Sequence, residues 1–218
     1  MRSPGKIVTY SVKEIFYTLQ GEGAQAGRAA VFLRFAGCNL WTGREDDRER
    51  AICRFCDTDF VGVDGTLGGK YGDPERLAQV VRSEWPTHSS GKPYVVCTGG
   101  EPLLQLDPPL ISALHAQGFE VAVETNGTQS APAGLDWICV SPKVGAPLIQ
   151  ARGDELKLVF PQNGGEPGRY EALEFRHFFL QPMDGASISH NSKAAVEYCL
   201  ANPQWRLSVQ THKVLGLR

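Results

Sequence analysis

Residues 94–102, YVVCTGGEP, join an apolar run to a Gly-Gly-Glu-Pro turn and set the pattern of the fold. The run 94–98 has the length and composition of a buried β-strand. A helical stripe of Leu110, Ile111 and Leu114 follows and is closed by Gly118. A second strand is predicted over 120–124. The order of strand, helix and strand favours parallel pairing, in which the helix is the crossover.

The same alternation extends along most of the chain. Further strands are predicted over 8–16, 30–36, 137–140, 155–160, 177–180 and 206–211, and further helices after Asp73, with Pro74 at the first position, and over 193–200. The links 125–136 and 141–154 are rich in Gly and Pro, so these crossovers need not contain full helices. We therefore expect an α/β fold, an incomplete (partial) TIM-like barrel of mostly parallel strands with fewer helices than strands.

The chain shows no linker or internal repeat that would divide it, so one domain over residues 1–218 is expected. Residues 1–5 resemble a cloning remnant and are left out of this reasoning. Ligands of such barrels lie at the carboxyl ends of the strands. Distinctive polar segments occur at those ends here: CTGGEP, ETNG, SPK, QPMD and QTHK. Their placement predicts an active site at this end of the barrel.

Composition restricts the classes of function. The chain has 218 residues, a net charge of −2 and 21% charged residues, without a cluster of Lys and Arg, which argues against a nucleic-acid surface. There is no run of about 18 apolar residues and no leader, so neither a membrane nor secretion is indicated. We expect a cytoplasmic protein whose six cysteines stay reduced.

Three cysteines, Cys38, Cys53 and Cys56, lie in the stretch 37–60, GCNLWTGREDDRERAICRFCDTDF. A structural metal site normally takes four protein ligands, whereas a site for chemistry leaves one position open. A zinc site would need a fourth ligand, yet His88 lies far along the chain in a polar loop. Disulfides do not suit the expected compartment. The third interpretation is a [4Fe–4S] cluster with one free iron.

The motif CRFC, with a lone cysteine before it at a strand end, resembles the radical S-adenosylmethionine superfamily, although the fourteen residues between Cys38 and Cys53 depart from the usual three. TLQGEG at 18–23, FLRFAGCNLW at 32–41 and CDTDF at 56–60 are similar to one family within it, 7-carboxy-7-deazaguanine synthase. These motifs and the strand-end segments run from Leu19 to Lys213, so the resemblance covers nearly the whole chain.

The resemblance implies a lyase of queuosine and deazapurine biosynthesis. S-adenosylmethionine would be the fourth ligand of the cluster and the source of a 5′-deoxyadenosyl radical, which takes hydrogen from 6-carboxy-5,6,7,8-tetrahydropterin and later returns it. The ring contracts, ammonia leaves and 7-carboxy-7-deazaguanine forms. Two alternatives remain open at this point: a radical activator of a glycyl-radical enzyme, and a zinc-binding structural or interaction module.

The resemblance also implies residues for S-adenosylmethionine. The backbone of the GGEP motif would seat its methionine end, and a strand-end acid would accept from the ribose hydroxyls, although such an acid can equally be a solvated charge. The residues implied are Gly100, Glu124, Ser141, Pro142, Lys143, Gln181, Pro182, Met183 and Asp184.

For the pterin, strand alternation places Arg34 on the face opposite Val31, Leu33 and Phe35, inside the barrel. A guanidinium there needs an anionic partner, which is either the substrate carboxylate or an acid of the barrel. The resemblance adds Leu19, Gln20, Gly21, Glu22 and Thr98 to the substrate contacts, and Arg218 is predicted to close over the pterin. Cys97, Cys139 and Cys199 are interpreted as core thiols, while the roles of His212 and Lys213 stay open.

The resemblance further implies Mg²⁺ on the hydroxyl of Thr58, whereas chemistry alone favours the flanking Asp57 or Asp59. A turn-capping role for Thr58 is the structural alternative. We further expect an electron donor such as flavodoxin and a homodimer.

Overall fold

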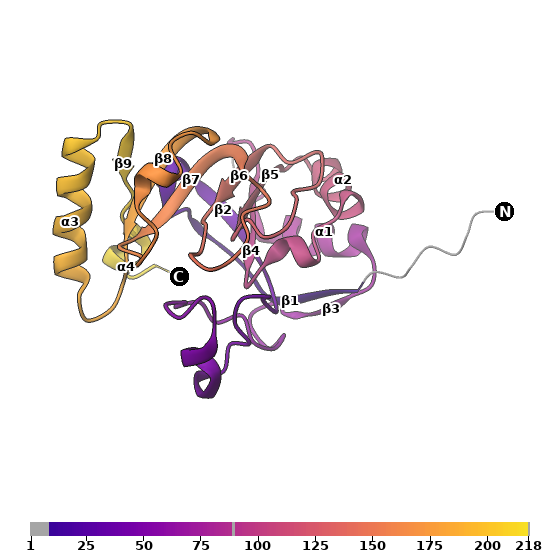
Figure 1. Cartoon of the computed structure of the whole chain (residues 1–218). Helices are drawn as coiled ribbons and strands as arrows, with labels where there is room; N and C mark the ends of the chain where they lie inside the picture. The colour runs from indigo at the N-terminus through magenta and orange to yellow at the C-terminus, as the bar shows by residue number, and fades with distance from the viewer. Residues whose placement is uncertain (1–8, 89, 218) are drawn as a thin grey trace.

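The structure is a computed structural model, and it describes residues 9–88 and 90–217. Nine strands form one curved sheet in this part of the chain (Figure 1). Their order across the sheet is β3-β1-β2-β4-β5-β6-β7-β8-β9. The strands are β1 Tyr10–Leu19, β2 Ala29–Phe35, β3 Gly69–Tyr71, β4 Tyr94–Gly99, β5 Glu120–Thr125, β6 Trp137–Val140, β7 Arg152–Phe160, β8 Glu174–Pro182 and β9 Trp205–Leu207.

From β2 to β9 every neighbouring pair is parallel, while β1 pairs antiparallel with both β2 and β3. The described residues contain four α-helices: α1 Pro74–Glu84, α2 Pro108–Ala116, α3 Ile188–Ala201 and α4 Thr211–Leu215. Asp73 and Asp107 cap α1 and α2 by accepting from the backbone of the first turn. The expected incomplete barrel, mostly parallel and with fewer helices than strands, is confirmed.

Two apolar clusters hold the sheet to its outer helices. The larger one joins α1 and α2 to β1, β2, β4 and β5 and includes Leu33, Leu77 and Leu110, all with no exposed surface. The smaller one joins α3 to β7, β8 and β9 through Leu156, Leu180 and Trp205. Because alternate residues of a strand point to opposite faces, this packing leaves the remaining side chains of the strands for the inside of the barrel.

The end of the predicted strand 206–211 is wrong. Strand β9 stops at Leu207. Ser208 still donates its backbone N–H to Leu180 of β8, but Thr211 donates instead to the carbonyl of Gly21 and begins α4. The helix predicted over 193–200 begins earlier, at Ile188. The predicted strand 8–16 is observed from Tyr10, and Val8 lies outside the described residues.

Two short elements, β3 and α4, were not foreseen. They have three and five residues, which is too short for a period in the sequence to be visible. Among the described helices, none has the length and apolar character needed to cross a membrane.

Candidate active site

A cavity of about 380 Å³ lies at the carboxyl ends of the strands. It gathers strand-end segments that are far apart in the sequence, together with the cysteine loop, residues 37–60. Predicted site residues in its lining are Leu19, Gln20, Gly21, Glu22, Arg34, Cys38, Cys53, Cys56, Thr58, Thr98, Gly100, Glu124, Ser141, Lys143, Gln181, Pro182, Met183 and Asp184. Pro142 instead lines a second, adjoining cavity, and Arg218 lies outside the described residues.

The three cysteines of the motif lie together on one wall. The Cys53 thiol donates a hydrogen bond to Cys56, which lowers the pKa of Cys56 to about 6, while burial raises the pKa of Cys38. No group of three or more His, Cys, Asp or Glu side chains in residues 9–88 and 90–217 is arranged around one metal ion. An iron–sulfur cluster does not require that arrangement, because its thiolates bind different irons. The three thiols therefore fit a cluster that has one position open.

The long insert between Cys38 and Cys53 fixes this loop. It contains a 3₁₀ helix, Glu45–Arg50, from which Arg48 donates to the carbonyl oxygens of Arg54 and Cys56 at 3.0 and 2.9 Å. The same guanidinium lies 3.9 Å from the ring centre of Trp41. The insert thus supports the cysteine pair from outside, and Figure 1 shows this part of the chain, in purple, projecting away from the strands.

Gly99 and Gly100 bring the end of β4 close to the end of β2 and to the cysteine loop. Gly99 has a φ of 143°, and a Cβ there would strike the carbonyl oxygen of Phe35. A Cβ on Gly100 would strike the carbonyl of Gly37 and the side chain of Cys38. Glycine is therefore required at both positions by the packing of the chain alone, beside any contact with a ligand.

The acid of the GGEP motif is structural. Glu101 has no exposed surface and accepts from the Thr125 hydroxyl and the Asn126 backbone at 2.7 and 2.8 Å. Burial raises the pKa of its carboxyl. Glu101 thereby ties the loop after β4 to the loop after β5, which places Gly100 and Glu124 in one wall.

Lys143 and Asp184 lie at two other strand ends. The Lys143 ammonium donates to the carbonyl and the hydroxyl of Ser141 at 2.7 and 2.6 Å, and burial lowers its pKa. Asp184 accepts from Lys213, which also bonds Asp57 of the cysteine loop, both at 2.5 Å. Lys213 therefore connects α4 to both sides of the cavity mouth.

Arg34 points into the cavity, as the alternation of β2 predicts, since Val31, Leu33 and Phe35 are fully buried on the other face. Its Nε donates to Glu14 Oε1 at 2.9 Å. The barrel therefore supplies an acid for Arg34. This contact uses one edge of the guanidinium, which has five donors in all.

Both aspartates beside Thr58 are engaged by lysines. Asp57 pairs with Lys213, and Asp59 pairs with Lys13 at 2.9 Å, which lowers the pKa of Asp59. Thr58 lies between them in the lining of the cavity. The two lysines thus each occupy one carboxylate oxygen of its neighbours, whereas the Thr58 hydroxyl is engaged by neither lysine.

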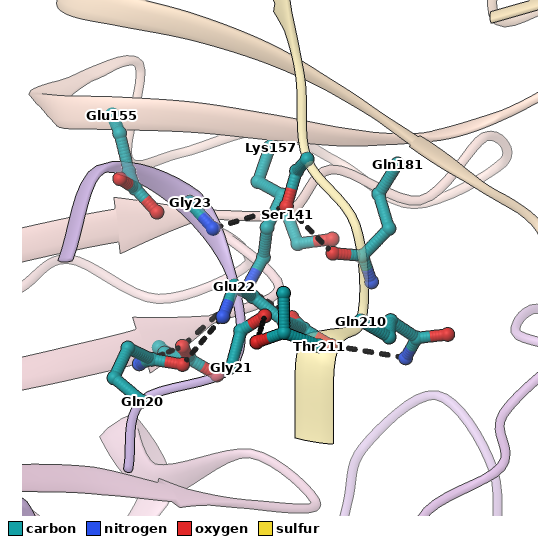
Figure 2. Close-up of polar contacts among 12 residues, drawn as sticks. Gln20, Gly21, Glu22, Gly23, Ser141, Glu155, Lys157, Gln181, Gln210 and Thr211 are labelled. Carbon is teal, nitrogen blue, oxygen red and sulfur yellow. Dashed lines mark hydrogen bonds and ion pairs between the residues drawn. The ribbon is translucent and has the colours of Figure 1, made fainter. Parts of the chain in front are cut away.

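A network of charged and amide side chains lies in the cavity lining (Figure 2). Lys157 of β7 donates to Glu22 at 2.5 Å and to Glu124 at 3.4 Å. Gln210 donates to the other oxygen of Glu22 at 2.9 Å. The sequence reasoning missed Lys157, Glu14 and Gln210. For Lys157 a signal existed, since alternation along ELKLVF places it on the face opposite Leu156 and Leu158.

His212 and Lys213, whose roles the sequence leaves open, line the cavity. Cys139, interpreted as a core thiol, is only 2% exposed and also lines the cavity. Cys97 is fully buried, as expected of a core thiol. Cys199 is partly exposed.

No family model matches the chain. Two relatives named 7-carboxy-7-deazaguanine synthase are similar over nearly its full length. One, from Caulobacter vibrioides, is 65% identical and covers 96% of this chain and 100% of its own. The other, from Bradyrhizobium diazoefficiens, is 64% identical and covers 97% and 100%. A crystal structure of QueE from Escherichia coli superposes with a TM-score of 0.68 at 26% identity, over 92% of this chain and 93% of that one.

Proposed function

The chain belongs to the 7-carboxy-7-deazaguanine synthase family, and from this membership we propose how its cavity carries out the family's reaction. It is an enzyme of the radical S-adenosylmethionine class, a lyase of deazapurine biosynthesis. The substrate is a small pterin, 6-carboxy-5,6,7,8-tetrahydropterin, and the product 7-carboxy-7-deazaguanine. The described residues act as one domain. The glycyl-radical activator and the zinc module are not favoured, because the relatives reported above are named 7-carboxy-7-deazaguanine synthase.

The observation that carries this proposal is the convergence of three thiols and five strand-end segments on one cavity. Cys38, Cys53 and Cys56 would hold a [4Fe–4S] cluster and leave one iron for S-adenosylmethionine. When bound, these groups supply a 5′-deoxyadenosyl radical that removes and returns a substrate hydrogen. The role of the chain is to position the cofactor and the substrate and to exclude water.

We assign the cofactor to one wall. The backbone at Gly100 would bind its methionine end, Glu124 would accept from the ribose hydroxyls, and the segments of Ser141 and Gln181 would line the remainder. Glu124 suits this role because its Oε2 accepts from no group in residues 9–88 and 90–217, while its Oε1 is held by Gln20 and Lys157. The remaining assigned contacts are Pro142, Lys143, Pro182, Met183 and Asp184.

We assign the pterin to the opposite side. Arg34 would bind the substrate carboxylate with the edge of its guanidinium that Glu14 does not use. Glu22, with about two of its four acceptor positions occupied by Lys157 and Gln210, can accept from ring N–H groups. Leu19, Gln20, Gly21 and Thr98 complete the contacts.

Magnesium on the Thr58 hydroxyl is proposed because lysines engage both neighbouring aspartates. The ion would take its other ligands from water and substrate, orient the ring and offset the charge that develops during contraction.

We further propose a cytoplasmic location, where thiols stay reduced, and an electron donor such as flavodoxin. A homodimer is proposed from exposed apolar side chains on α3 and α4: Leu200, Val214 and Leu215 are 78%, 76% and 64% exposed. Sedimentation of the wild type and of a Leu200→Glu variant tests the dimer, and a wild-type monomer would reject it.

The test of the reaction is anaerobic reconstitution with iron and sulfide, followed by supply of S-adenosylmethionine, a reductant and the pterin. Formation of 7-carboxy-7-deazaguanine and ammonia is expected. A protein that binds one zinc tightly, takes up no iron and yields no product would overturn the proposal.

A further inference from the structure

Lys157 lies on the inner face of β7, between Leu156 and Leu158, which are fully buried on the outer face. Its side chain is only 5% exposed. Burial alone would lower the pKa of Lys157, but attraction by Glu124 and Glu22 raises it well above its ordinary value. The charge is therefore kept inside the barrel by two carboxylates.

These carboxylates come from distant strands. Glu22 follows β1, whereas Glu124 ends β5, and the sheet order separates both from β7. Both nevertheless meet one ammonium, at 2.5 and 3.4 Å. Figure 2 shows Lys157 reaching from its strand to the loop that holds Glu22.

Two glutamines complete the arrangement. Gln20 donates to Glu124 at 2.9 Å and accepts from the backbone N–H of Glu22 at 3.1 Å. Gln210 donates to Oε1 of Glu22, the oxygen that Lys157 does not bond. Both carboxylates are thus fixed in direction by groups around them, and Lys157 is the cation that they share.

Resting on the proposed function, we propose that Lys157 is a positioning residue. It holds Glu22, on the pterin side, and Glu124, on the ribose side, at a fixed separation. The substrate hydrogen is thereby kept next to the ribose C5′. Without it, two carboxylates would share a buried site with no cation, and one of them would turn away or take up a proton.

The test uses cluster-reconstituted enzyme and Lys157→Met, with Lys193→Met as the control, since Lys193 lies exposed on α3. Because the hydrogen is returned in each turnover, wild-type enzyme should release little free 5′-deoxyadenosine per product. In Lys157→Met we expect this ratio to rise about tenfold and the affinity for 6-carboxypterin, an unreactive analogue measured by fluorescence, to fall about tenfold.

A double-mutant cycle separates positioning from mere stabilisation. If Lys157 acts through Glu22, the effect of Lys157→Met on analogue affinity should largely disappear in a Glu22→Gln background. Strict additivity, or an unchanged ratio of 5′-deoxyadenosine to product, would overturn the inference. If Lys157→Met does not fold, Lys157→Arg, which keeps the charge, should retain the low ratio, and a high ratio there would count against the proposal.

Failure of the proposed function has a different signature. In that case wild-type enzyme would form no 7-carboxy-7-deazaguanine, while the binding cycle on the same proteins would still report whether Lys157 and Glu22 are coupled.

Discussion

The cysteine loop and the network around Lys157 line the same cavity but are held in opposite ways. In the loop, Arg48 supports the backbone from outside, the Cys53 thiol bonds Cys56, and Cys38 accepts from the backbone N–H of Leu40. In the network, every charged side chain has a partner from a different strand. The network is thus organised by the chain itself, whereas the loop presents the three thiols that we propose hold the cluster. Substitutions should therefore act differently in the two regions.

The largest expected effect is in the cysteine loop. Cys38→Ala, Cys53→Ala and Cys56→Ala should each reduce cleavage of S-adenosylmethionine by more than about 1,000-fold, because a cluster that loses a thiolate is not retained. Iron content and 5′-deoxyadenosine formation measure this. Cys97→Ala and Cys199→Ala, matched changes outside the cavity, should keep cleavage. Full activity in any of the first three variants would show that this cysteine does not hold the cluster.

A smaller, selective effect is expected at Arg34 on the network side. Arg34→Ala should weaken binding of the carboxylated pterin about 10- to 100-fold, the size of a lost charge-assisted contact, and change the affinity for S-adenosylmethionine less than about threefold. Calorimetry with each ligand measures this. Arg28→Ala is the control, since Arg28 also pairs with a glutamate, Glu120, but does not line the cavity. Equal losses for both ligands in Arg34→Ala would contradict the assignment.

The next prediction concerns Thr58, which belongs to the cysteine loop and lines the cavity. Thr58→Val should leave iron content and cofactor binding intact and remove most of the Mg²⁺ stimulation of turnover, about a few-fold, because the hydroxyl ligand is lost. Titration of activity with Mg²⁺ measures this. If Asp57→Asn or Asp59→Asn removes the stimulation while Thr58→Val keeps it, the ion belongs to an aspartate.

The last prediction concerns the pH dependence of stability. Burial alone would raise the pKa of Glu22, but attraction by Lys157 lowers it from 4.5 to about 2. The ionised carboxylate therefore stabilises the fold above the ordinary pKa, and this contribution, no more than about 3 kcal/mol, is lost as pH falls from 4.5 towards 2. Urea unfolding of the metal-free protein should show the wild type losing its advantage over Glu22→Gln in this interval. A constant difference across it would show that the ion pair adds no stability.

Much of the fold can be predicted from the sequence, because the spacing of apolar residues that marks a strand or a helix is visible within each short segment. The parallel strands and the capped helices α1 and α2 follow from apolar runs and turn residues within each segment. Strand alternation predicts the inward position of Arg34, and the same rule applied to β7 would have indicated Lys157. The partners of these residues do not follow in this way. Glu14 meets Arg34 through the antiparallel register of β1 and β2, and Gln210 reaches Glu22 across 188 positions of sequence.

Such long-range contacts have a consequence for the order in which the chain folds. The loop after β1 is held by residues that are made much later: Gly23 donates to the Ser208 hydroxyl and Thr211 to the carbonyl of Gly21, across 185 and 190 positions of sequence. During synthesis on a ribosome, the large apolar core around α1 and α2 can assemble while these partners are still missing. Contacts of such long sequence separation form late, because the entropy of closing the loop opposes them. The loop at Gly21 and Gly23 thus acquires its substrate-facing shape only after residues 208–211 have emerged.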